Sequence, residues 1–417
     1  MKLTILTQYY PPEVGAPQNR LSHLASQFVS EGHDVTVLTA MPNYPAGKIQ
    51  PGYGGLCRRE WQGAVRVIRT FIYPSQSAAL MPRLLSYFSF VFSSLVFGSF
   101  LLKPSDYLLV ESPPLFLGMA AVWLGWLKGA RVIFNVSDLW PESAVRLGLI
   151  REDSFAHRIT LRLESFFYRH AWLVTGQSRS ILEDIESRFP DRPTFLLSNG
   201  ADTHVFQPQS RTEEARARLT SKNEFVLLYA GLHGLAQGLE HVLAAAEELA
   251  HDEGYRFVFI GDGPNKQKLV LKANKDGISN VSFLDSLPSA QMPKLLAAAD
   301  LVVVPLGLHI PGAVPSKLYE AMASGRPIVL VASGEAAEVV LRHKAGIVVA
   351  PGQVPSLVRA IREMRTDQKL ALTLSRNARL AAIEHFDRTK IGKSFIRYLE
   401  SWGPDWQAEK HYESTHI

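Results

Sequence analysis

Lys317 and Glu320 lie three residues apart in the stretch GAVPSKLYEAMASGRP, which separates two apolar runs, LVVVPL and PIVLVA. If this stretch is a short helix, the two side chains share one helix face. A carboxylate can accept two hydrogen bonds from a ribose cis-diol, and a lysine ammonium can bind the oxygens of a diphosphate. The spacing therefore predicts a nucleotide-diphosphate site. The alternative is an ordinary Lys–Glu surface pair.

Glycine-rich turns follow two other apolar runs. Gly231, Gly234 and Gly238 come after FVLLYA, and Gly261 and Gly263 come after RFVFI. Glycine lets the backbone approach a ligand closely, as in nucleotide and sugar-nucleotide sites. The spacing departs from G-x-G-x-x-G, which argues against a hydride-transfer enzyme that binds a nicotinamide dinucleotide. The alternative for each stretch is a plain turn.

A third loop of this kind follows the first apolar run, in YYPPEVGAPQNRLSHLASQF. Two prolines end the strand, Gly15 permits an unusual backbone angle, and a helix is expected to begin near Gln18. A helix N-terminus presents free N–H groups and the positive end of a dipole, which favour an anion. Arg20 adds a cation. The alternative is an ordinary turn between a strand and a helix.

The elements that must position these loops alternate along the whole chain of 417 residues. Near-continuously apolar strands separated by helices are typical of parallel sheets covered on both faces. The alternation pauses at QSRTEEARARLTSKNE and then starts again. We therefore predict an α/β protein of two Rossmann-like, doubly wound domains facing a central cleft, with ligands beyond the carboxyl ends of the strands. The expected parts are a domain at 1–203, a linker at 204–222, a domain at 223–385, and a C-terminal helix and tail at 386–417 that can pack back on the first domain.

Composition limits the class of protein. The chain is 47% hydrophobic and 20% charged, as in globular proteins, and its formal net charge is +5. That excess suits nucleotide phosphates or anionic lipid and is too small to indicate nucleic acid. Cys57 is the only cysteine, so no intramolecular disulfide can form, in agreement with a reducing cytosol. The N-terminus MKLTILTQYY shows no secretory signal, and we expect a cytoplasmic protein.

An uncharged stretch at 84–102 contains five Phe and one Tyr and is bracketed by Arg83 and Lys103. Its length would just permit a membrane span. A span inside the first domain would divide that domain across the bilayer, so we favour a helix lying on the cytoplasmic leaflet of the inner membrane, with its aromatic face and flanking cations. The alternative is a buried crossover helix.

Taken together, several motifs resemble the large retaining glycosyltransferase family 4, which has the two-Rossmann GT-B fold. They are PPEVGAPQNRLSHLASQFVSEGHDVTVLT, NVSDLWPES, SNGAD, YAGLHGLAQGL and PSKLYEAMASGRPIV, and they extend over nearly the whole chain. MPNYPAGKIQPGYGG and DLWPES resemble the WbuB-type branch, whose members are linked to N-acetyl-fucosamine transfer in bacterial surface polysaccharide assembly.

The resemblance implies a donor site. Glu320 matches the second Glu of the family's E-x7-E motif, which binds the donor ribose, and Gly15 and Ala16 match its N-terminal diphosphate loop. Gly312 replaces the first Glu, so recognition of the donor sugar must come from the backbone of the two residues that follow it, or from elsewhere. The implied donor-binding set is Gly15, Ala16, Arg20, Gly231, Gly234, Gly263, Ala313, Val314, Ser316, Lys317, Leu318 and Glu320.

Two further departures from the family affect charge and catalysis. The family's usual Arg and Lys after the first strand of the second domain fall on Leu232 and Gln237, which makes Lys317 together with Arg20 the natural replacement. The common His-Asp pair of the first domain becomes Ser-Asp, which leaves Asp138 as the candidate catalytic group. Asp138 would orient the acceptor hydroxyl or stabilise the positive sugar, with a helix cap as the alternative.

The activity implied by the resemblance is retaining transfer of a sugar from a nucleotide diphosphate, with UDP expected, to a polyprenyl-diphosphate-linked saccharide. It needs no metal and no cofactor, because fixed dipoles and cations stabilise the leaving diphosphate. Two alternatives stay open. One is a GT-B-shaped sugar-nucleotide epimerase similar to UDP-GlcNAc 2-epimerase, which needs no acceptor surface. The other is a non-catalytic nucleotide-sugar binding module, in which Asp138 would be dispensable.

Overall fold

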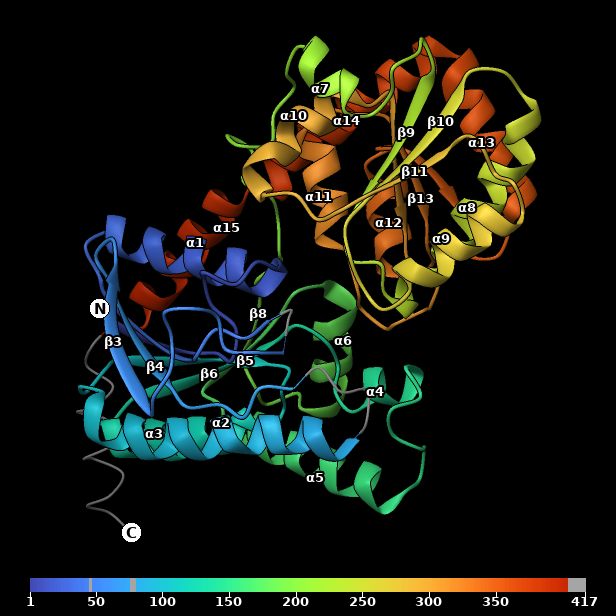
Figure 1. Cartoon of the computed structure of the whole chain (residues 1–417). Coiled ribbons are helices and arrows are strands. Elements are labelled where there is room, and N and C mark those ends of the chain that lie inside the picture. The colour runs from blue at the N-terminus through green and yellow to red at the C-terminus, as the bar shows by residue number, and fades with distance from the viewer. Residues whose placement is uncertain (45–46, 76–79, 404–417) are drawn as a thin grey trace. The chain divides into compact units, whose positions relative to one another are not determined.

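The computed structural model describes residues 1–44, 47–75 and 80–403 (Figure 1). The predictions that fall on 45–46, within MPNYPAGKIQPGYGG, and on the tail from 404 lie outside the described residues. The chain forms two compact units, Met1–Ser198 with the C-terminal residues from Thr389, and Asn199–Arg388.

The first unit contains an eight-stranded sheet in the order β3-β4-β2-β1-β5-β6-β7-β8. Every neighbouring pair is parallel except β3 and β4, which are antiparallel. The strands are β1 (Lys2–Leu6), β2 (Asp34–Ala40), β3 (Cys57–Gln62), β4 (Val65–Thr70), β5 (Tyr107–Ser112), β6 (Arg131–Val136), β7 (Leu173–Gly176) and β8 (Thr194–Leu196).

Helices cover both faces of this sheet (Figure 1). One buried cluster joins the sheet to α2, α3 and α5 and includes Phe90 and Phe167, and the other joins it to α1 and α15 through Phe28 and Phe395. The helices are α1 (Ala16–Ser30), α2 (Leu80–Leu101), α3 (Leu117–Lys128), α4 (Glu142–Arg146), α5 (Phe155–His170), α6 (Arg179–Arg188) and α15 (Arg388–Ser401). The end of the described chain therefore packs on the first unit.

The second unit contains a six-stranded, fully parallel sheet in the order β11-β10-β9-β12-β13-β14. The strands are β9 (Phe225–Ala230), β10 (Tyr255–Ile260), β11 (Val281–Leu284), β12 (Leu301–Pro305), β13 (Ile328–Val331) and β14 (Ile347–Val349). The helices are α7 (Glu213–Ala217), α8 (Leu239–Glu248), α9 (Lys266–Lys275), α10 (Met292–Ala298), α11 (Ser316–Ala323), α12 (Glu335–Arg342), α13 (Val354–Thr366) and α14 (Gln368–His385), with short 3-10 turns at Leu235–Gln237, Leu249–His251 and Ser289–Gln291.

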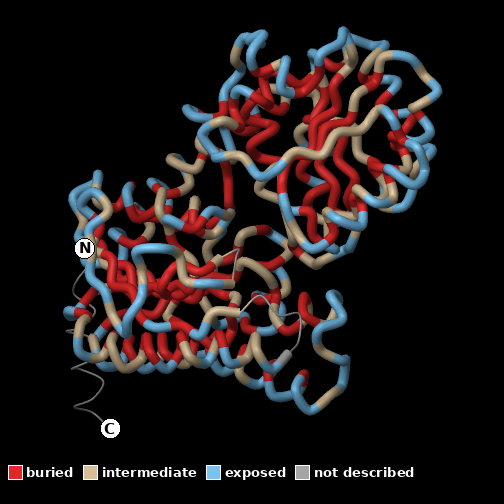
Figure 2. The backbone as a smooth tube through the Cα atoms, in the orientation of Figure 1, coloured by how far each residue is buried: buried red, intermediate tan, exposed pale blue. Residues whose placement is uncertain are grey.

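The central strands of both sheets are β-branched and aromatic runs that are buried on both faces. β5 and β6 are buried along their whole length, and so are β12 and β13 (Figure 2). Polar side chains in such strands would lose water without gaining partners, so they collect at the strand ends. The prediction of two doubly wound α/β domains is confirmed.

The segment expected as a linker, 204–222, is folded onto the second unit. Phe206, Ala215 and Leu219 are buried in its core. Arg216 lies 2.9 Å from Asp300 Oδ2 and donates to the carbonyl of Ala298. Apolar side chains spaced through a polar stretch were enough to anchor it, and the unit begins at Asn199 rather than after a free linker.

The apolar helix α2 has a buried face and an exposed face. Met81–Leu101 has a mean hydropathy of 1.8 and is, within the described chain, the one helix long and apolar enough to cross a membrane by length and composition. Only 33% of that stretch is buried. Phe90 is fully buried, whereas Phe92 is 70% and Phe100 is 83% exposed. One face of α2 therefore belongs to the core of the first unit, and the opposite face carries aromatic side chains in contact with solvent.

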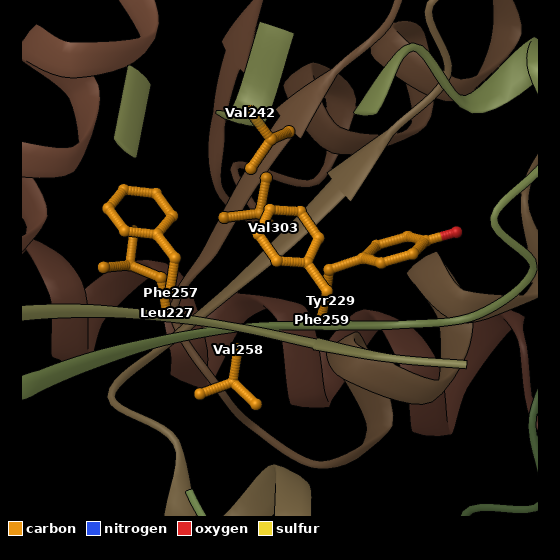
Figure 3. A pocket seen from close by; sticks show the side chains of 7 residues that line it. All are labelled: Leu227, Tyr229, Val242, Phe257, Val258, Phe259 and Val303. Atoms are coloured by element: carbon orange, nitrogen blue, oxygen red, sulfur yellow. The ribbon is translucent and has the colours of Figure 1, made fainter. Parts of the chain in front are cut away.

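A small apolar space lies inside the core of the second unit (Figure 3). Phe257 and Phe259 point to one side of β10, and Val258 points to the other (Figure 3). The only polar group that Figure 3 shows there is the hydroxyl of Tyr229, which donates to the carbonyl of Leu232 at 2.6 Å. This space is part of the packed core, and the chemistry must lie at the strand ends.

The docking of α15 can be tested by stability. Phe395 is fully buried between Phe28 and Phe195, at 6.2 and 5.2 Å between ring centroids. Phe395→Ala should lower the free energy of unfolding of the first unit by about 3–5 kcal/mol, because it leaves a cavity. All seven tryptophans lie outside the second unit, so tryptophan fluorescence in urea follows the first unit alone.

The matched control is Phe100→Ala, which removes a ring that is 83% exposed. It should change the free energy of unfolding by less than about 0.5 kcal/mol. Equal effects of the two substitutions would show that α15 is not part of the first core.

Candidate functional site

Lys317 and Glu320 share one face of α11, the helix that connects β12 to β13. Lys317 Nζ lies 3.0 Å from Glu320 Oε2, and the two side chains are 41% and 10% exposed. The carboxylate is thus held in a nearly buried position while the ammonium reaches solvent. The pair therefore differs from the alternative, in which both charges would be surrounded by water. Here a ligand can approach the nearly buried carboxylate and the exposed ammonium from one side.

Two glycines allow the loops after β9 and β10 to touch. Gly261 and Gly263 have φ of 144° and 151°. A Cβ at Gly261 would lie 1.9 Å from the Gly231 carbonyl oxygen, and one at Gly263 would lie 2.6 Å from the His233 carbonyl oxygen. Asn265 N donates to that same His233 carbonyl at 2.9 Å. These glycines are therefore required for packing one loop against the other.

The loop after β9 also packs against the loop after β12. Gly307 N donates to Gln237 O at 3.2 Å, and the Cβ that an alanine would add at Gly238 would lie 2.7 Å from Gly307 Cα. β10, β9 and β12 are neighbours in the sheet, so their three loops meet at its carboxyl edge. Ligands of doubly wound sheets bind at this edge. The structure thus brings Gly231, Gly234 and Gly263 of the predicted set into one group of loops.

His233 is a residue of these loops that the sequence analysis missed. It has no exposed surface, and neither ring nitrogen has a hydrogen-bond partner among the described residues. Burial, with a smaller contribution from Lys266, lowers the pKa of His233 to about 4. The ring is therefore neutral at pH 7. A single His inside a glycine-rich loop was its only signal in the sequence.

Not every residue of the predicted donor set can use its side chain. Leu318 is fully buried in the core of the second unit, where only its backbone could reach a ligand. Ala313 and Val314 are partly buried against the same core. Ser316 begins α11. Of the predicted set at this edge, the polar side chains that can reach a ligand are therefore those of Ser316, Lys317 and Glu320.

In the first unit, Gly15 does not have the unusual backbone angle that we expected. Its φ is 175°, an extended angle that any residue adopts, and α1 begins directly after it, at Ala16. A Cβ on Gly15 would instead lie 2.4 Å from Gln18 Oε1. That oxygen is the end of a flexible side chain, which can shift, so neither the backbone angle nor a backbone contact requires a glycine here.

Glu13 holds the same loop in place. It is 3% exposed, and its carboxylate accepts hydrogen bonds from three backbone N–H groups, those of Asn43 and Tyr44 at 2.7 Å and that of Tyr10 at 3.3 Å. Burial raises its pKa, and the three hydrogen bonds oppose that shift. The loop after β1 is thereby tied to the loop after β2.

Arg20 has a different partner from the diphosphate that we expected. Its guanidinium donates to both oxygens of Glu111 at 2.6 Å and to Ser137 Oγ at 3.2 Å. The Arg20 and Glu111 side chains are 5% and 2% exposed. A buried cation requires an opposite charge, and Glu111 at the end of β5 supplies it. The positive charge of Arg20 is therefore neutralised within the first unit.

Further polar groups at this edge also escaped the sequence analysis. Asn135 Nδ2 donates to Glu111 Oε2 at 2.6 Å, and Thr175 Oγ1 donates to Asn135 Oδ1 at 2.7 Å. Ser137 Oγ donates to Glu111 and accepts from Gln177 Nε2. The cluster connects the ends of β5, β6 and β7. In the sequence, each of these residues could have been recognised as a polar residue at or near the end of an otherwise apolar strand.

Asp138 lies next to this cluster and is partly exposed. Burial of the carboxyl group, with a smaller contribution from the charge of Glu111, raises the pKa of Asp138 to about 7, and Arg20 opposes this shift. The capping residue of α4 is Pro141, and α4 has no side-chain cap, so Asp138 is not the helix cap that we kept as an alternative. A carboxyl group that titrates near neutrality can bind or release a proton at physiological pH.

The described part of the chain contains no group of three or more His, Cys, Asp and Glu side chains arranged to hold a metal ion.

Two family models match the chain, one for each unit. The model of the glycosyl transferase 4-like domain matches residues 15–200, and the model of the glycosyl transferases group 1 matches residues 210–381.

Two of the similar sequences come from bacteria. The Escherichia coli K12 protein assigned to colanic acid biosynthesis as glycosyl transferase WcaI is 27% identical over 412 residues, covering 95% of this chain and 98% of that protein. The glycosyltransferase WbjE of Pseudomonas aeruginosa is 30% identical over 233 residues, covering 55% of this chain and 58% of that protein.

Similar structures confirm the GT-B fold. Sucrose-phosphate synthase from Thermosynechococcus elongatus has a TM-score of 0.76 at 18% identity, covering 96% of this chain and 98% of that chain. Anabaena HepE in complex with UDP-glucose has a TM-score of 0.69 at 18% identity, covering 96% of this chain and 100% of that chain.

The raised pKa of Asp138 predicts a pH-dependent stability. Between about pH 4 and pH 7 the folded protein keeps a proton that the unfolded chain has lost, so the ionisation of Asp138 reduces stability as the pH rises through this range. Asp138→Asn removes this effect. It should stabilise the first unit by on the order of 2 kcal/mol near pH 8 and by nothing near pH 4. Urea unfolding over this pH range measures the difference.

Asp191→Asn, at an exposed position of the same unit, is the control and should leave the pH dependence as it is in the wild type. If Asp138→Asn gives the same difference from wild type at every pH, the raised pKa of Asp138 is contradicted.

Proposed function

Since this chain is a glycosyltransferase of the group 1 type, we propose that it transfers a sugar from a nucleotide diphosphate to a polyprenyl-diphosphate-linked saccharide with retention of configuration. The observation that carries the proposal is the preformed Lys317–Glu320 pair beside three interlocked loops at the carboxyl edge of the second sheet. The relative named for colanic acid biosynthesis supports a role in a bacterial surface polysaccharide.

On the donor side, Glu320 would hold the ribose hydroxyls and Lys317 the diphosphate. UDP is the proposed nucleotide, because the structurally similar HepE has been solved with UDP and with UDP-glucose. N-acetyl-fucosamine or a similar N-acetyl sugar is the proposed group transferred, on the strength of the motifs MPNYPAGKIQPGYGG and DLWPES. Gly312 stands where a second carboxylate would contact the sugar, so its recognition falls to backbone groups.

In the proposed reaction, the bond between the sugar C1 and the diphosphate oxygen breaks, and its electron pair stays on the leaving nucleotide. The acceptor hydroxyl oxygen forms the new bond to C1 on the same face, and its proton departs. Lys317 stabilises the leaving negative charge. Asp138 is proposed to orient the acceptor hydroxyl and to accept that proton, for which a pKa of about 7 is suited. The proposal uses no protein nucleophile, metal or cofactor.

The acceptor is proposed to be lipid-linked because of the apolar surface of the first unit. α2 and α3 lie side by side (Figure 1), joined where Trp123 Nε1 donates to Ser99 Oγ at 3.1 Å. Their exposed side chains include Phe92 at 70%, Phe100 at 83% and Trp126 at 73%.

The charges around this surface are basic. Arg83 lies in the first turn of α2, Lys103 follows α2, and Lys128 ends α3. Arg158 and Arg162 are exposed on the neighbouring α5. An aromatic face bordered by cations fits an anionic lipid surface. We therefore propose a cytoplasmic enzyme bound peripherally to the inner membrane through 84–102 and α3.

The direct test incubates the full chain with a panel of radiolabelled nucleotide sugars and polyprenyl-diphosphate-linked saccharides, followed by extraction of the lipid product. Label in the lipid fraction supports the proposal. Conversion of the free nucleotide sugar to an epimer, or binding without any turnover, would replace it by one of the two alternatives, the epimerase or the binding module.

The donor assignment predicts a loss of nucleotide affinity. Glu320→Ala should weaken UDP binding about tenfold to a hundredfold, since a lost charge-assisted hydrogen bond costs about 1.5–3 kcal/mol. Lys317→Ala should do the same through the diphosphate. Calorimetry with UDP measures both. Lys294→Ala and Glu248→Ala, at exposed positions of the same unit, should keep wild-type affinity, and unchanged affinity in all four variants would contradict the assignment.

The membrane assignment predicts release from vesicles. Replacing Phe92, Phe100 and Trp126 together by Ser removes three exposed apolar side chains, each of which contributes about 1.5–3 kcal/mol when buried in lipid. The triple variant should stay in solution when mixed with phosphatidylglycerol vesicles and centrifuged, whereas the wild type should sediment with them. UDP affinity should not change.

The control replaces three exposed leucines of the second unit, Leu341, Leu372 and Leu380, by Ser. This variant should sediment like the wild type. Equal sedimentation of both triple variants with the vesicles would show that the α2–α3 face does not dock on lipid.

A further inference from the structure

Tyrosines gather where β1 ends in the first unit. The rings of Tyr9 and Tyr44 meet edge to face, with 5.7 Å between centroids and 69° between planes. Tyr9 follows β1, and Tyr44 follows β2, the next strand in the sheet. Both are partly exposed. The Tyr44 backbone is fixed by its hydrogen bond to Glu13, so the pair is held rigidly at the carboxyl edge.

Two residues of α2 complete this group. Tyr87 and Arg83 are near enough to act on the Tyr9 hydroxyl, since Tyr87 raises its pKa and Arg83 lowers it, both after the larger effect of burial. Both are partly exposed. Tyr87 also packs against the core of the unit. We call Tyr9, Tyr44, Tyr87 and Arg83 the tyrosine cluster.

The polar ends of the tyrosine cluster are not used by the protein. In the part of the chain that the structure describes, the three hydroxyls have no hydrogen-bond partner and Arg83 has no ion pair. The nearby acid, Glu13, already accepts from three backbone N–H groups. Partly buried hydroxyls and guanidinium groups are usually satisfied within a protein. Three hydroxyls and one cation are thus available together to a polar, anionic ligand.

The helix that carries Arg83 and Tyr87 is linked by side-chain contacts to the loop of Asp138, the group proposed to act on the acceptor. The N-terminal half of α2 runs along the strand ends, where Tyr73 N donates to Ser89 Oγ at 2.8 Å and Phe88 contacts Phe116 at 4.8 Å between centroids. Phe116 in turn contacts Trp140 at 5.9 Å, two residues after Asp138. A chain of aromatic contacts therefore links α2 to the Asp138 loop.

We propose that the tyrosine cluster binds the sugar–diphosphate end of the lipid-linked acceptor. Aromatic rings suit the apolar faces of sugar rings, the tyrosine hydroxyls can bond sugar hydroxyls, and Arg83 can pair with a phosphate through its planar donors. The polyprenyl chain would continue along the exposed apolar side chains of α2. This inference rests on the proposed function and names the subsite that the acceptor occupies.

The test measures binding to vesicles of phosphatidylethanolamine and phosphatidylglycerol with and without undecaprenyl-diphosphate-linked N-acetylglucosamine. The wild type should bind the doped vesicles more tightly than the plain ones. Tyr9→Phe with Tyr44→Phe keeps both rings and removes two hydroxyls, and it should reduce this gain about tenfold. Arg83→Gln should reduce it likewise. Plain-vesicle binding should be unchanged in the double tyrosine variant, and UDP binding should be unchanged in both variants. For each variant the effect is taken as the ratio of doped-vesicle to plain-vesicle affinity, so that a general loss of anionic-lipid affinity in Arg83→Gln cancels.

Doped vesicles that carry undecaprenyl diphosphate without a sugar separate the two parts of the ligand. Arg83→Gln should weaken binding to them, and the double tyrosine variant should not. Tyr398→Phe and Arg66→Gln, away from the tyrosine cluster in the same unit, are the matched controls and should keep the full gain.

Two results would overturn the inference in distinguishable ways. In the first, the lipid-linked sugar increases vesicle affinity equally for the wild type, the double tyrosine variant and Arg83→Gln. The acceptor then binds elsewhere, and the proposed function stands. In the second, the wild type binds doped and plain vesicles equally tightly while UDP binding is intact. The proposal of a lipid-linked acceptor is then contradicted, and so is the proposed role of the tyrosine cluster.

Discussion

The ion pair between Arg20 and Glu111 is the interaction on which the carboxyl edge of the first unit depends. Both side chains are almost completely buried, so removing either partner would leave a charge without water, at a cost of about 3–5 kcal/mol. Glu111 also accepts from Asn135 and Ser137. One carboxylate thereby joins α1 to the ends of β5 and β6, and its negative charge helps to keep Asp138 protonated up to about neutral pH.

In the second unit, the carboxyl edge of the sheet is held together by close backbone packing instead of by a buried ion pair. Its central strands β9 and β12 carry no charged residue, and the one in β10, Arg256, lies near the start of that strand. Polar contacts are therefore again concentrated near the strand ends. There the loops interlock through backbone contacts at Gly261, Gly263 and Gly238, where no side chain fits. The result is a rigid edge with few charges, and Lys317 with Glu320 supplies the charged pair at the start of the adjacent helix. A rigid edge holds its donors in place before a ligand arrives, which lowers the cost of binding.

In the first unit, the two faces of helix α2 have different surroundings. α2 must cover the sheet, which its buried face does through Phe90, and it presents aromatic rings such as Phe92 and Phe100 to solvent. Serines on the buried side make this possible, since Ser93 and Ser94 are small and satisfy their hydroxyls on nearby oxygens. The sequence analysis treated a core helix and a membrane-bound helix as alternatives, and the structure shows a helix with one buried face and one exposed aromatic face.

The sequence by itself determined the properties that depend on neighbours along the chain. Strand and helix periodicity predicted two doubly wound domains, and a spacing of three predicted that Lys317 and Glu320 would share a helix face. Tertiary structure alone decided which distant groups meet. Arg20 and Glu111 are 91 positions apart, and the stretch 204–222 became part of a core. The physical reason is that a buried charge or a close backbone contact depends on what lies opposite in space, which local pattern does not specify.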